Sequence, residues 1–135
     1  MVLSVLAPSP VSAVEGHGRI EDVVRTVGPR SVVVEVFVDG MGPGYEVTGS
    51  FLGGRTYFNS DGVFTDSGPV RCRGFSYREK SRKGISVVSV ALPRVCVTVD
   101  ALRAVRVHLL MRDPHETGDA IYRLLDSAEI PRARG

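Results

Sequence analysis

Long runs of β-branched residues restrict the fold of this 135-residue chain more than any other feature. Residues 31–39 read SVVVEVFVD, and residues 85–93 read ISVVSVALP. Valine and isoleucine lose side-chain freedom in a helix and pack well on a pleated sheet. The nearly continuous apolar run at 31–39 predicts a strand that is buried over much of both faces. Between the two runs, Gly53-Gly54 and Asp61-Gly62 separate shorter alternating segments, which is typical of antiparallel hairpins.

Two other segments have the apolar spacing of a helix. In RIEDVVRTVG (19–28) the apolar residues recur at i, i+3, i+4 and i+7, and Gly28-Pro29 follows as a helix stop. RDPHETGDAIYRLLDSAEIP (112–131) begins with a capping-box arrangement of Asp113, Pro114 and Glu116. The predicted buried stripes are Ile20, Val23, Val24 and Val27 in the first helix, and Ile121, Leu124, Leu125 and Ala128 in the second.

These segments predict an α+β fold, a single compact domain over residues 19–130. A mainly antiparallel sheet is expected, with the short N-terminal helix and the C-terminal helix packed on it. Residues 1–18 contain prolines and glycines among serines and alanines and predict a flexible arm. The arm has no basic n-region, so we expect it to be retained and the protein not to be secreted. Residues 131–135 form a short basic tail.

Cys72 and Cys96 are the two cysteines, and neither lies in a C-x-x-C pair or beside a histidine at metal-ligand spacing. We expect two reduced thiols in β segments, which favours a reducing compartment. The three histidines, His17, His108 and His115, form no ligand cluster in the sequence. The sequence therefore predicts no metal site and no cofactor.

Positive charge is concentrated in one part of the chain. Between Val70 and Arg112 there are ten Lys or Arg residues against two acids, Glu79 and Asp100, while the remainder has more acids than bases. Such a chain either presents a basic face to an anionic partner or pairs its halves within one molecule or between copies. We therefore expect self-association and an anionic partner.

The segment RCRGFSYREKSRKG (71–84) is the centre of this basic region. If residues 70–77 and 85–91 pair as a hairpin, alternation brings basic and aromatic side chains to one strand face, and an exposed basic turn follows. Such a surface can neutralise phosphates while bases stack on the rings, and an anionic membrane attracts the same cations. The candidates are Arg71, Arg73, Phe75 and Tyr77 on the strand, and Arg78, Lys80, Arg82 and Lys83 in the turn. A solvated hairpin without a binding role is the alternative.

VFTDSG (63–68) resembles the Asp-Ser/Thr-Gly element of aspartic proteases. In a retroviral-type protease, two copies of the chain would each contribute one aspartate, here Asp66, to a shared dyad. Thr65 and Pro69 depart from the apolar and small residues that are usual at their positions. A plain turn is the favoured interpretation, and we expect no enzyme.

The order of elements over residues 20–128 resembles the matrix proteins of small-matrix negative-strand RNA viruses, the bornavirus and nyamivirus kind. The resemblance is carried by SVVVEVFVDG (31–40), GISVVSVALPRVCVTV (84–99) and RVHLLMRDPHETGDAIYRLLD (106–126). It implies a compact sheet with flanking helices in a non-enzymatic homo-oligomer. That oligomer would line the inner membrane surface of the virion or lie in the host cytoplasm or nucleus, and would bind RNA or the viral ribonucleoprotein. The second hypothesis is a free-standing RNA-binding viral accessory protein, and the third is the dimeric protease.

Overall fold

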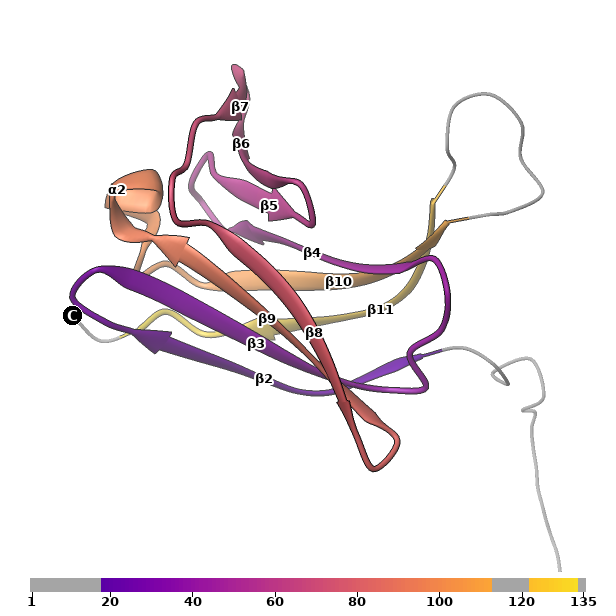
Figure 1. Ribbon diagram of the computed structural model, residues 1–135. Helices are drawn as coiled ribbons and strands as arrows, with labels where there is room; N and C mark the ends of the chain where they lie inside the picture. Colours follow the sequence, from indigo (N-terminus) through magenta and orange to yellow (C-terminus); the bar gives the residue numbers. More distant parts are fainter. Residues whose placement is uncertain (1–17, 113–121, 134–135) are drawn as a thin grey trace, which may run out of the picture.

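The computed structural model describes residues 18–112 and 122–133, which form two antiparallel sheets packed face to face (Figure 1). The first sheet has six strands in the order β11 (Tyr122–Ile130), β10 (Val105–Arg112), β4 (Tyr45–Phe51), β5 (Tyr57–Asn59), β6 (Gly62–Thr65) and β7 (Gly68–Val70). The second has four strands in the order β2 (Arg19–Val27), β3 (Ser31–Asp39), β9 (Ile85–Pro93) and β8 (Ser76–Arg82). The described chain is therefore a β-sandwich.

The core lies between the two sheets and consists of every second residue of the long strands. On the four-stranded sheet the fully buried residues are Val32, Val34, Val36, Val38, Val88, Val90 and Leu92. They pack against residues of the six-stranded sheet that include Val47, Phe58, Val105, Val107 and Leu109. The intervening residues of β3 are partly exposed. The prediction that 31–39 is buried over much of both faces is therefore wrong, because no second layer formed by the described residues covers the outer face of this sheet.

The α+β prediction is also wrong, because strands stand where the flanking helices were expected. The helical elements of the described residues are α2 (Arg94–Val97) and the 3-10 turn η1 (Thr98–Asp100), which are too short to cover a sheet. Residues 19–27 form β2, and residues 122–130 form β11. The predicted cap at Asp113, Pro114 and Glu116 lies outside the described residues, as does Ile121. Within the described ranges, no helix has the length and apolar character needed to cross a membrane.

A β-bulge explains the helix-like spacing in β2. Ile20 pairs with Val38 and Asp22 pairs with Phe37, so Glu21 is an extra residue on this strand. An extra residue reverses the inside-outside alternation. Ile20 and Val23 therefore both pack against the core although they are three residues apart. Val24 belongs to the predicted helix stripe but points outward and is 39% exposed.

A second bulge has the same effect in β11. Leu109 pairs with Asp126 and Leu110 pairs with Leu124, which leaves Leu125 without a cross-strand partner. Leu125 and Ala128 both pack against the core, three residues apart, while Leu124 points outward and is 60% exposed. In both segments a bulged strand produces the i, i+3 spacing that predicted a helix.

The two sheets are joined along one side by their edge strands, β2 and β11, which lie next to each other (Figure 1). The N–H of Ile20 donates to Asp126 Oδ2 at 2.8 Å. Arg25 donates to the carbonyl oxygens of Arg103 and Pro131, the latter at 2.6 Å. Side chains, and not a continued backbone ladder, therefore close this side of the sandwich.

Cys72 and Cys96 form a disulfide, with their Cα atoms 5.9 Å apart. Cys72 lies in the loop between β7 and β8, and Cys96 lies in α2. The prediction of two reduced thiols in β segments is therefore wrong. The bond joins the loop before β8 to the helix after β9. It therefore encloses the hairpin that β8 and β9 form.

We expect the double variant Cys72→Ser/Cys96→Ser to lose about 3 kcal/mol of unfolding free energy, because the cross-link restricts the unfolded chain. The bond spans a sequence separation of 24 residues. Chemical denaturation of both proteins measures the difference. As a direct check, a thiol reagent should label neither cysteine of the unmutated protein denatured without reductant. Labelling of both would show that the bond does not form.

Gly49 allows β4 and β5 to come close together. A Cβ atom at this position would lie 2.3 Å from Cζ of the fully buried Phe58. We therefore expect Gly49→Ala to lower the free energy of unfolding by about 1–3 kcal/mol through overpacking. Thermal unfolding of Gly49→Ala and of the control Ser50→Ala, whose side chain is on the outer face, tests this. Equal losses in the two variants would contradict the steric explanation.

Candidate functional site

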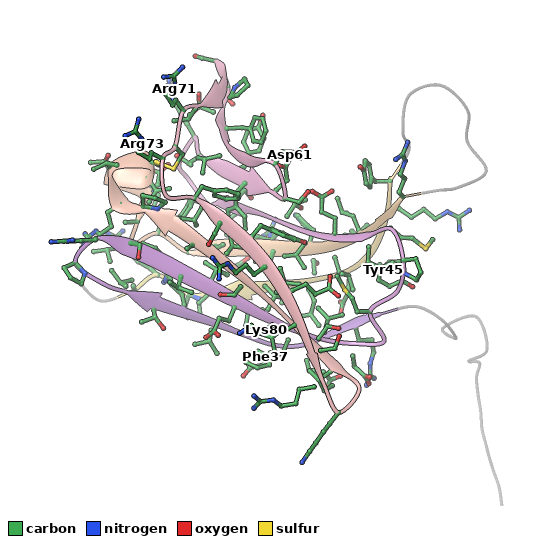
Figure 2. The ribbon with its side chains drawn as sticks, in the orientation of Figure 1. Phe37, Tyr45, Asp61, Arg71, Arg73 and Lys80 are labelled. Carbon is green, nitrogen blue, oxygen red and sulfur yellow. A yellow bond between two sulfur atoms is a disulfide. The ribbon has the colours of Figure 1, made fainter. Side chains whose placement is uncertain are left out.

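The basic segment 71–84 is divided between two ends of the molecule. Arg71 and Arg73 lie in the loop that precedes β8, and Gly74 in that loop has a φ of 96°. The ladder between β8 and β9 runs from Ser76 to Arg82. Figure 2 shows Arg71 and Arg73 at one end, beside the disulfide, and Lys80 toward the projecting tip of the hairpin. Arg71 and Arg73 therefore do not lie on the strand face on which alternation placed them.

Phe75 and Tyr77 do not share a face with Arg71 and Arg73, because both aromatic side chains pack against the core. Tyr77 reaches from β8 to β4, where its hydroxyl accepts a hydrogen bond from the N–H of Val47 at 2.9 Å. β5 pairs with β4 only at Gly49 and Ser50, so the N–H of Val47 lies beyond this ladder. Tyr77 therefore satisfies a strand donor and links the two sheets.

Three basic side chains do share one face. Arg78, Lys80 and Arg82 alternate along β8 and point away from the core, on the outer side of the sheet. Successive members are separated by roughly 6.6 Å along the strand. Among the described residues, no ion pair joins any of them to a carboxylate. The turn consists of Lys83 and Gly84, both with positive φ. Arg78, Lys80 and Arg82 were predicted in the turn but lie on strand β8.

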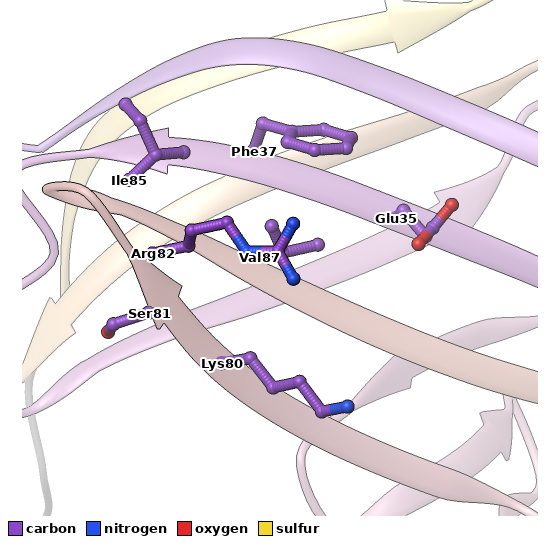
Figure 3. Close-up of a pocket in the computed structure, with 7 residues that line it drawn as sticks. All are labelled: Glu35, Phe37, Lys80, Ser81, Arg82, Ile85 and Val87. Carbon is purple, nitrogen blue, oxygen red and sulfur yellow. The ribbon is translucent and has the colours of Figure 1, made fainter.

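These cations border a groove on the outer face of the four-stranded sheet (Figure 3). The groove has a volume of about 520 Å³ and is lined by Glu35, Phe37, Lys80, Ser81, Arg82, Ile85 and Val87. A hollow of about 260 Å³ continues it and adds Arg78 and Ser89 to the lining. We call the two together the basic groove. One wall is cationic, the floor is largely apolar, and Phe37 supplies an aromatic ring.

Sequence reasoning missed Glu35 and Phe37, which lie on β3 and reach the groove across β9. The prediction that SVVVEVFVD is buried over much of both faces left little outward surface for either side chain. The available signal was Glu35 itself, because an unpaired carboxylate among valines is costly to bury and indicates an exposed face.

The remaining candidate position is Asp66. Asp66 is exposed in the turn between β6 and β7, where the N–H of Ser67 donates to Thr65 Oγ1 at 3.2 Å. This is the geometry of the plain turn. Within residues 18–112 and 122–133, no group of three or more His, Cys, Asp and Glu side chains is placed to hold a metal ion.

Burial raises the pKa of Tyr77 from 10.0 to about 12. The folded state therefore prefers the protonated phenol, and this contribution to stability is complete below pH 10 and is lost as the pH rises toward 12. We expect Tyr77→Phe to lower the free energy of unfolding by about 1 kcal/mol at neutral pH, because the Val47 N–H loses its acceptor. The variant should also lose less stability than the wild type above pH 10. Denaturant unfolding of both proteins across this range measures both effects, and parallel pH profiles would contradict the assignment.

Comparison with known proteins identifies no relative of this chain. No protein-family model, curated protein or solved structure matches the chain. Any function must therefore be inferred from the side chains that the two sheets place on their outer faces.

Proposed function

We propose that the protein is a non-enzymatic binding protein that holds single-stranded RNA in the basic groove. The observation that supports this most is the row of Arg78, Lys80 and Arg82, which are exposed, share one face and have no ion-pair partner among the described residues. A cationic track beside an aromatic ring provides the two elements of single-strand binding, phosphate neutralisation and base stacking. Phe37 is the ring in this groove.

The position of Glu35 indicates how the bound RNA would be oriented on the sheet. Glu35 lines both parts of the groove from β3, whereas the cations line it from β8. A carboxylate repels phosphate and accepts hydrogen bonds from the amino groups of bases. The RNA backbone should therefore follow β8, with its bases directed over β9 toward Phe37 and Glu35.

β8 is also an edge strand, and charges on an exposed edge discourage pairing with another sheet. Protection of the edge requires charge but no ligand. RNA binding requires in addition that the three cations release counterions from phosphates. The two roles therefore differ in their dependence on salt when RNA is present.

The matrix-type role stays a prediction, together with self-association, binding to ribonucleoprotein and contact with an anionic membrane. It depends on a resemblance to proteins with flanking helices, and β2 and β11 occupy those positions here. A free-standing RNA-binding protein needs only the groove, so the geometry favours this second hypothesis.

Binding of a fluorescent single-stranded RNA across a salt series tests the proposal. Three phosphate contacts predict a log-log slope of about −2, from about 0.7 per neutralised phosphate. The variant Arg78→Ala/Lys80→Ala/Arg82→Ala should bind weakly, with a slope near zero. The control variant Arg71→Ala/Arg73→Ala removes cations at the other end of the molecule and should keep the wild-type slope.

A further variant separates the aromatic contribution from the ionic one. Phe37→Ala should weaken binding at every salt concentration and leave the slope unchanged, because it removes stacking and no charge. The proposal would be overturned if the wild-type protein bound no RNA. It would also be overturned if the triple β8 variant and the Arg71→Ala/Arg73→Ala control lost equal RNA affinity. Flotation with phosphatidylserine vesicles in the absence of RNA binding would assign the groove to lipid instead.

A further inference from the structure

The outer face of the six-stranded sheet carries a hollow that belongs to a different sheet from the basic groove. It has a volume of about 350 Å³ and is lined by Thr48, Gly49, Ser50, Tyr57, Phe58, Asn59 and His108. This volume is at the small end of the range for ligand sites in proteins. The lining comes from β4, β5 and β10, three adjacent strands.

The strand register explains the shape of this hollow, which we call the β4 trough. On the outer face, Thr48 of β4 is opposite His108 of β10, and Ser50 of β4 is opposite Tyr57 of β5. Small side chains on the central strand thus lie between larger ones on both neighbours. The trough follows β4, with the imidazole on one side and the phenol ring on the other.

The Tyr57 ring is supported on the side away from the trough. It stacks on Phe64 of β6, with ring centroids 5.5 Å apart and planes 14° apart. Because β6 and β4 flank β5 on opposite sides, the other face of the Tyr57 ring is directed toward β4. Tyr57 is 41% exposed. A ring held in one orientation, with one face open, is suited to packing against a flat apolar ligand surface.

Beside Gly49 and Phe58, the lining includes four polar side chains, and no lining residue carries a carboxylate, ammonium or guanidinium. Thr48, Ser50 and Asn59 offer hydroxyl and amide groups. Nδ1 of His108 is buried and has no hydrogen-bond partner among the described residues. The nearest basic residue along β10, Arg106, is paired with Glu129 at 3.0 Å.

We propose that the β4 trough binds a neutral saccharide, with one sugar ring packed on Tyr57. A pyranose ring presents apolar C–H groups on its face and hydroxyl groups at its edge. The face fits the open side of the Tyr57 ring, and the hydroxyls can exchange hydrogen bonds with Thr48, Ser50 and Asn59. Because no lining residue carries an ammonium or guanidinium group, a phosphate or carboxylate ligand would lose solvation without gaining such a partner.

Native electrophoresis through gels that contain soluble polysaccharides tests this. The neutral probes are hydroxyethyl cellulose, arabinoxylan, galactomannan and glycogen. At least one should retard the full chain, and Tyr57→Ala should weaken that interaction at least tenfold, as measured from the dependence of mobility on polymer concentration. Tyr122→Ala is the matched control, because Tyr122 is also an exposed tyrosine on the outer face of this sheet, opposite Arg112 and outside the trough.

A second variant keeps Tyr57 and fills the trough instead. Ser50→Phe places a ring on the floor of the trough and should abolish retardation, with folding of both variants checked by thermal unfolding. No retardation of the wild type by any neutral polymer would overturn the proposal, as would unchanged retardation of Tyr57→Ala.

An anionic probe separates this proposal from the RNA-binding one. One outcome is that heparin alone retards the protein, and that this retardation is lost in the triple β8 variant but kept in Tyr57→Ala. This outcome would locate polysaccharide binding in the basic groove and overturn the assignment to the trough. RNA binding that fails while a neutral polymer still retards the wild type would overturn only the basic-groove proposal.

Discussion

Alternate valines of β3 and β9 pack between the two sheets, and the positions of both candidate binding faces depend on that packing. A slip of one residue would exchange every inward and outward side chain of a strand. In β3 such a slip would bury Glu35 and expose Val34 and Val36, which is unfavourable at each position. The outward positions are therefore determined as strictly as the core itself. The groove beside β8 and the trough along β4 lie on the outer faces of the two sheets.

Much of the strand content could be predicted from the sequence, because β-branched residues and glycine turns act locally. The two helix predictions failed for a shared physical reason. In a regular strand, core residues are separated by even numbers, but Glu21 and Leu125 are each an extra residue in a bulge. The bulges place Ile20 with Val23, and Leu125 with Ala128, on the same side. Without the partner strand, this spacing cannot be distinguished from the face of a helix.

The candidate site could be predicted only in part. The exposed cations Arg78, Lys80 and Arg82 were recognisable as a group, because charge density is visible along the chain. Their common face depends on where β8 begins, and Tyr77 marks the opposite, inward side. Phe37 and Glu35 come from a distant segment, and only the strand order β3-β9-β8 brings them to the groove. The Cys72–Cys96 bond was missed for the same reason, since spacing along a chain does not show whether two distant thiols meet.

The disulfide turns the hairpin of β8 and β9 into a covalent ring. The bond joins Cys72, before β8, to Cys96, after β9, and the chain between them carries all three cations of the groove. The exposed tip at Lys83 and Gly84 is the natural place for a protease to cut such a hairpin. A cut there would open the ring but release neither strand, because β9 continues into α2 and β8 stays attached through the sulfur atoms. The basic groove is thus built on a segment that can lose its backbone continuity and remain one molecule.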